Sequence, residues 1–187
     1  NTGLSISDVD SGSGSMTVTL SVTEGTLAVT AGGSGAVVNN SGTSSVTITG
    51  TVAQINSLLS TDATSTVSYT DGTDTPSASA TLTLQVNDNG NTGGGSLTSS
   101  DTATINITAV NDAPVIDLSN VFGVQTTATT ASFTENGGAV TIAPQLTLSD
   151  VDRLTLAGAT VTLTDPQAGG GLSLQGQGAA SGGLAGG

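Results

Sequence analysis

The stretch Met16-Thr-Val-Thr-Leu-Ser-Val22 decides the fold of this chain. Apolar and hydroxyl-bearing side chains alternate along it without a break. Because successive side chains of a β-strand point to opposite faces of a sheet, this alternation directs one row into a core and the other into water. The sequence therefore predicts a half-buried β-strand at these residues.

The same alternation recurs along the chain. It is longest at residues 80–86 and 102–109, and shorter runs lie at 4–6, 46–48, 67–69, 146–148 and 161–163. Stretches rich in Gly, Ser, Asn and Asp separate the runs, and threonine, a β-branched residue, dominates their polar face. Many short strands at this spacing predict an all-β fold, an antiparallel β-sandwich.

One segment departs from this two-residue alternation. Residues 51–60 place Val52, Ile55 and Leu59 at helical spacing, and Thr51 precedes them as a suitable N-cap. The sequence predicts one short helix here that crosses between sheet edges, with a structural role.

The charge balance excludes several classes of function. Fourteen carboxylates stand against one basic residue, Arg153, and the net charge is −13. Nucleic acid and anionic membranes need a basic face, which this chain cannot build. Lysine, histidine and cysteine are absent, so no serine or threonine has an imidazole or amine base to activate it. We therefore expect no enzyme activity. No apolar run approaches the ~20 residues needed to span a bilayer, so we expect no membrane insertion.

An internal repeat divides the chain. Leu4-Ser-Ile-Ser-Asp-Val-Asp10 matches Leu146-Thr-Leu-Ser-Asp-Val-Asp152, and a similar strand pattern follows each copy, at 16–20 and at 159–163. We expect a first β-sandwich at residues 1–112 that lacks its N-terminal edge strand. Residues 113–187 are expected to form the first part of a second, truncated repeat. Pro114, which has no backbone N–H, marks the boundary.

Several motifs together resemble a known family. Asp8-Val-Asp10, Gly50–Asn56, Val86–Asn91, Asn111-Asp-Ala-Pro114 and Thr134-Glu-Asn136 resemble the tandem cadherin-like, immunoglobulin-like repeats of giant bacterial adhesins of the RTX type. The resemblance covers nearly the whole chain. It implies an extracellular or cell-surface location, sandwich modules in tandem, and calcium at the junctions between modules. It also implies a structural role in cell adhesion, as a stalk that holds an adhesive tip away from the cell.

Aspartate pairs are the candidate metal ligands. In an extended Asp-Val-Asp segment both carboxylates point to one side and the valine to the core, and Ca²⁺ binds six to eight hard oxygen ligands. By the resemblance, one junction site would take Glu135, Asp150, Asp152, Asn111 and Asp112, while Asp8 and Asp10 would serve the first unit. Asp88 would add a ligand or only shape a turn. Asn and Asp are also ordinary turn residues, so the alternative without metal stays open.

Two other functions remain alternatives to the stalk. The first is a subunit of an extracellular filament or sheath, in which a strand from a like subunit completes the first unit. The second is a carbohydrate-binding module with surface glycans as partners. In the stalk itself, the partners are the neighbouring repeats of the same polypeptide.

Overall fold

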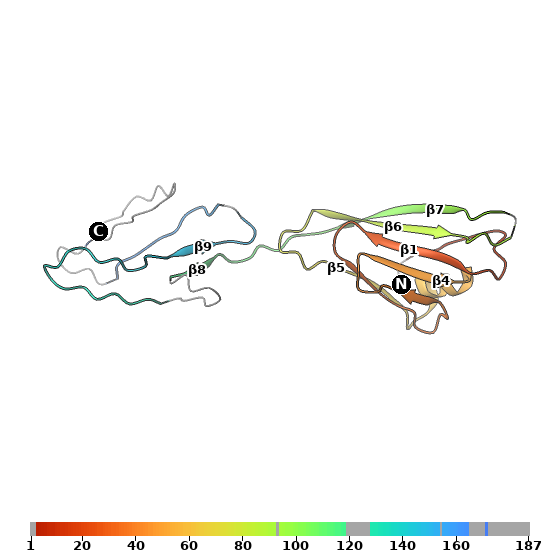
Figure 1. Ribbon diagram of the computed structural model, residues 1–187, viewed down its shortest axis with the longest axis horizontal. Helices are drawn as coiled ribbons and strands as arrows, with labels where there is room; N and C mark the ends of the chain where they lie inside the picture. The colour runs from red at the N-terminus through yellow and green to blue at the C-terminus, as the bar shows by residue number, and fades with distance from the viewer. Residues whose placement is uncertain (1–2, 93, 119–127, 154, 165–170, 172–187) are drawn as a thin grey trace. The chain divides into compact units, whose positions relative to one another are not determined.

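The computed structural model describes residues 3–92, 94–118, 128–153, 155–164 and 171. The chain divides into two compact units, Asn1–Asn111 and Asp112–Gly187. Their boundary lies one residue before the one expected from the repeat. The described residues form antiparallel sheets and a short helical segment (Figure 1). The prediction of an all-β chain with antiparallel pairing and one short helix is confirmed.

A five-stranded antiparallel sheet is the larger layer of the first unit. Its strands lie in the order β3-β4-β1-β6-β7 (Figure 1). Their bounds are Met16–Val22 for β1, Val37–Asn39 for β3, Ser45–Gly50 for β4, Ser79–Asn87 for β6 and Thr98–Asn106 for β7. The central strand β1 buries every second residue, as the alternation of the deciding stretch predicts.

The first unit also contains a two-stranded sheet. It pairs β2 (Thr26–Thr30) with β5 (Thr66–Thr70) in antiparallel register. Leu27 and Val29 of β2 join one hydrophobic cluster with Val18 and Leu20 of β1, and all four side chains are buried. This shared core holds the two sheets of the first unit together, since burial of apolar surface is the main favourable term in folding.

A helical segment carries the chain from one sheet to the other. It consists of α1 (Val52–Asn56) and the π-helical turn η1 (Ser57–Thr61), between β4 and β5. Thr51 is its N-cap: the Thr51 side chain accepts a hydrogen bond from the Gln54 N–H, and the Gln54 side chain accepts one from the Thr51 N–H. The predicted cap is confirmed, and this reciprocal pair satisfies two backbone donors of the first turn.

The second unit has a smaller regular part among its described residues. Strand β8 (Val115–Asp117) pairs antiparallel with β9 (Thr147–Ser149) (Figure 1). The strand expected at 159–163 does not form. Val161 is 55% and Leu163 is 44% exposed, so the described part of the second unit does not bury the apolar side chains of this segment. No helix in the described part of the chain is long and apolar enough to cross a membrane.

Candidate functional site

Two loops meet at one end of the first unit. One contains Asp8 and Asp10 and leads into β1, and the other, residues 88–97, joins β6 to β7. Because β1 and β6 are antiparallel, with Thr17 opposite Asn87, the start of one strand lies beside the end of the other. The sheet register thus brings together two segments that are about eighty residues apart in sequence.

Side-chain amides and a hydroxyl group join the two loops. Asn89 Nδ2 and Asn91 Nδ2 both donate to the carbonyl oxygen of Ser15, at 3.0 and 2.7 Å. Thr92 Oγ1 donates to the carbonyl oxygen of Asp10. These contacts hold the segment that carries Asp10 against the loop that follows Asp88.

The aspartate pair lies in a tight turn and not in a strand. Asp8 Oδ1 accepts hydrogen bonds from the backbone N–H groups of Asp10 and Ser11, each at 3.1 Å. The expectation that Val9 points into the core is wrong, since Val9 is fully exposed. The same holds for Val151, which is 52% exposed. The alternation of an extended chain fails because an aspartate that binds the backbone two residues on closes a turn instead.

The turn nevertheless brings two carboxyl groups together. A side-chain hydrogen bond with Asp8, followed by the negative charge of Asp8 and a smaller effect from Asp88, raises the pKa of Asp10 above its ordinary value. The only basic residue of the whole chain is Arg153, which belongs to the second unit. The first unit therefore has no basic side chain of its own to neutralise this pair.

Asp88 shapes the second loop. Its Oδ1 accepts the backbone N–H groups of Gly90 at 2.9 Å and Leu97 at 2.7 Å. These two hydrogen bonds lower the pKa of Asp88, and the negative charge of Asp88 adds a small contribution to the raised pKa of Asp10. Asp88 thus shapes a turn, one of the two roles predicted for it, and its carboxylate adds negative charge near the aspartate pair.

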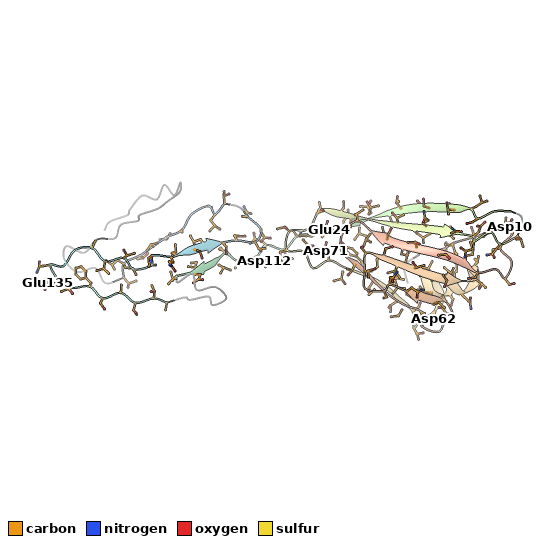
Figure 2. All side chains as sticks on the ribbon, in the orientation of Figure 1. Asp10, Glu24, Asp62, Asp71, Asp112 and Glu135 are labelled. Atoms are coloured by element: carbon orange, nitrogen blue, oxygen red, sulfur yellow. The ribbon has the colours of Figure 1, made fainter. Side chains whose placement is uncertain are left out.

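Three of the five residues expected at one junction site lie together in the second unit. The Asp112 N–H donates to Asp152 Oδ2, and the Asp152 N–H donates to Asp150 Oδ1 at 3.0 Å. Glu135 lies at the opposite end of this unit from Asp112 (Figure 2). The structure does not bring Glu135 to the other three. Asn111 is the last residue of the first unit.

The carboxylate oxygens of these aspartates are ligands of the type that a hard cation binds, but they do not enclose an ion by themselves. Among the described residues, no group of three acidic side chains lies close enough to enclose a metal ion. The negative charges of Asp8 and Asp10 in one turn are of the kind that a divalent cation neutralises. Ca²⁺ accepts carboxylate, carbonyl and water oxygens together. Asp8 and Asp10 therefore fit as the carboxylate part of a calcium site whose remaining ligands are carbonyl or water oxygens.

A second acidic group lies at the other end of the first unit and is not evident in the sequence (Figure 2). Glu24 accepts the Ser77 N–H through both carboxylate oxygens, at 3.1 and 3.2 Å, and the Tyr69 hydroxyl donates to Asp71 Oδ2 at 3.3 Å. Burial and then the charges of Asp71 and Glu24 raise the pKa of Tyr69. Only the pairing of β2 with β5 reveals that Glu24 and Asp71 flank the same sheet end.

Comparison with known proteins gives no relative for this chain. No protein-family model matches it, and no curated protein or solved structure matches it. The functional argument therefore depends on the residues and their geometry.

Proposed function

We propose that this chain is a structural stalk segment of a secreted bacterial surface adhesin, built from β-sandwich modules in tandem and stiffened by calcium. The observation that carries the proposal is the Asp8–Asp10 carboxyl pair in a unit without a basic residue. Two like charges held in one turn repel each other, and a bound divalent cation removes this repulsion.

The architecture of the first unit supports the sandwich part of the proposal. Its five-stranded and two-stranded sheets share one hydrophobic core, which is the arrangement of a two-layer sandwich. The repeated Leu-x-x-Ser-Asp-Val-Asp motif, at 4–10 and 146–152, supports a tandem arrangement. The first unit has no histidine, lysine or cysteine, and Tyr69 is its one aromatic residue. This composition suits a passive spacer better than an enzyme.

Calcium would act as a cross-link between segments that the chain already holds close. Asp8 and Asp10 would hold the ion in the first unit, with Asp88 adding negative charge. Asp150 and Asp152, beside Asp112, would form the corresponding site in the second unit. A bound ion stabilises the folded state by mass action, because the unfolded chain does not gather these carboxylates.

Calorimetric titration of the full chain with Ca²⁺ tests the proposal. We expect saturable binding at about 0.1–1 mM, the range of extracellular calcium modules, and a lower melting temperature in EDTA. The double variant D8N/D10N should lose one class of site, because an amide removes the charge while keeping the size.

A matched control separates a specific site from general charge. D74N/D101N removes two negative charges at exposed positions in other segments of the chain, and we expect it to bind calcium as the parent chain does. Equal loss in both variants would mean that calcium only screens the net charge. No heat of binding at millimolar calcium would reject the calcium-stiffened stalk.

A further inference from the structure

The chain contains two Asn-Gly dipeptides, Asn89-Gly90 in the first unit and Asn136-Gly137 in the second. In such a pair the backbone nitrogen of the glycine can attack the side-chain amide carbon of the asparagine, because glycine has no Cβ to hinder the approach. The asparagine then loses its amide group. The rate of this loss depends on how firmly the fold holds the two reacting groups.

The two dipeptides are matched in three respects. Each asparagine follows an acidic residue, Asp88 in the first case and Glu135 in the second. Both asparagines are exposed, and both have a left-handed backbone, with φ of 56° at Asn89 and 59° at Asn136. The preceding residue, the exposure and φ therefore do not distinguish the two sites.

Hydrogen bonds hold both reacting groups of the first dipeptide. Asn89 Nδ2 donates to the Ser15 carbonyl oxygen at 3.0 Å and to Thr17 Oγ1 at 3.1 Å. The Gly90 N–H donates to Asp88 Oδ1 at 2.9 Å. The pKa of Asp88 is lowered, so its carboxylate is charged at neutral pH. A negative charge beside this N–H opposes the loss of the proton, which must precede attack by the nitrogen.

The second dipeptide is held less firmly. The Gly137 N–H donates to the neutral carbonyl oxygen of Thr134 at 2.9 Å, which closes a local turn. The side chain of Asn136 makes no hydrogen bond to any residue that the structure describes. Residues 131–142 are all exposed, so little buried surface opposes the opening of this turn.

We propose that Asn136-Gly137 is a site of spontaneous deamidation and that the fold protects Asn89-Gly90 from the same reaction. Hydroxide removes the N–H proton of Gly137, and the nitrogen bonds to Asn136 Cγ while the bond from Cγ to Nδ2 breaks. Nδ2 takes a proton from water and leaves as ammonia, which gives a cyclic succinimide. Water then opens the ring. Cleavage of the bond to Cγ gives aspartate, and cleavage of the bond to the main-chain carbonyl carbon gives isoaspartate.

The reaction adds a carboxylate directly after Glu135, which lies at the opposite end of the second unit from Asp112 (Figure 2). A chain with a net charge of −13 thus gains a further negative charge in an exposed turn, without an enzyme. The inference goes beyond the proposed stalk function and requires neither calcium nor a partner.

Mass spectrometry of the folded full chain, kept in EDTA at mildly alkaline pH and sampled over time, tests the inference. Cleavage after Glu24 and Glu135 places Asn89 in residues 25–135 and Asn136, the only asparagine that follows Glu135, in residues 136–187. Tandem mass spectrometry locates the acid within each fragment. We expect deamidation at Asn136 to be about tenfold or more faster than at Asn89. The reason is that the first site must break three hydrogen bonds and the second only one.

The unfolded chain is the matched control. In urea both dipeptides lose their hydrogen-bond partners, while each keeps the acidic residue before it and the glycine within it, so the two rates should converge. Asn136→Gln should abolish the reaction at this position, because the longer side chain would have to close a larger ring.

A variant in the first unit should remove the protection there. Asp88→Ala deletes the acceptor of the Gly90 N–H, so deamidation at Asn89 should become several times faster while Asn136 reacts at the parent rate. The fluorescence of Tyr69, the single tyrosine and part of the first unit, reports whether D88A still folds.

Three results would overturn the inference. The first is an equal rate at Asn89 and Asn136 in the folded chain. The second is an intact Asn136 in the folded chain under conditions in which the urea-unfolded chain reacts there. The third is the same ratio of rates with and without urea, which would mean that local sequence and not the fold sets the difference. Because the incubation contains EDTA, none of these results depends on the outcome of the calcium titration.

Discussion

The side-chain amide of Asn56 binds both backbone polar groups of Ile6, fifty residues earlier in the sequence, through two hydrogen bonds of 2.8 Å. Asn56 is the last residue of α1, and Ile6 is buried in the core of the first unit. The amide thus replaces a strand partner on one edge of the Ser5–Ser7 segment. It fixes the polypeptide just before the Asp8–Asp10 turn.

Replacement of Asn56 by alanine should destabilise the first unit by about 1–3 kcal/mol, because it leaves a partly buried donor and acceptor of Ile6 without partners. Chemical denaturation followed by Tyr69 fluorescence measures this change. N56D keeps the acceptor for the Ile6 N–H but places a carboxylate oxygen against the Ile6 carbonyl, and should therefore be destabilised too. An N56A variant as stable as the parent would show that the amide does not hold this segment.

The helical segment offers a test of core packing. Leu58 lies in the π-helical turn and is only 1% exposed. Leu58→Ala should lower the free energy of unfolding by about 2–5 kcal/mol, through lost burial and the cavity left behind. Val52, which is half-buried at the start of α1, is the matched control, and Val52→Ala should cost clearly less. Equal losses at the two positions would contradict the observed packing of this segment.

The Asp10 carboxyl group predicts a pH dependence of stability. Its pKa is raised in the folded state, chiefly by the hydrogen bond with Asp8, so the folded protein binds this proton more tightly than the unfolded chain. The resulting stabilisation is present below the ordinary pKa of aspartate and is lost as the pH rises through the raised value. Thermal melts in EDTA across this range should show the loss. D10N should remove it.

Asp62 provides the control of opposite sign. A hydrogen bond from Thr64 Oγ1 at 2.6 Å, then those from the backbone N–H groups of Thr64 and Ser65, lower the pKa of Asp62. Its contribution to stability is present above the ordinary pKa and disappears as the pH falls through the lowered value. D62N should change the stability only at the acidic end of the pH profile. A pH profile of stability that D10N leaves unaltered above the ordinary pKa would contradict the raised pKa of Asp10.

Sequence reasoning succeeded where the signal is local. The alternation of Met16–Val22 predicts both the strand and its buried face, because period-two geometry is a property of the extended backbone itself. Thr51 and Gln54 predict the start of the helix in the same way, since a capping box spans only four residues. The presence of aspartates in the turn at 8–10 is likewise a local preference.

Strand pairing changed several expectations. The run expected at 102–109 is in fact Thr98–Asn106, because β7 pairs with all nine residues of β6 and draws in the polar stretch at 98–101. Ladder hydrogen bonds, and not apolar side chains, determine where that strand ends. Residues 159–163 show the converse: their alternation forms no strand, and Val161 and Leu163 stay exposed among the residues that the structure describes.

The sequence by itself determined the class of fold, the central strand Met16–Val22, the cap of the helix and the acidic character of the chain. The tertiary structure alone decided that the loop after Asp88 lies against the segment that carries Asp10, that Glu24 and Asp71 share a sheet end, and that Glu135 lies away from Asp112. The physical reason is the range of the interactions. Side-chain alternation and capping act over a few residues, whereas the meeting of loops depends on the register between strands that are tens of residues apart.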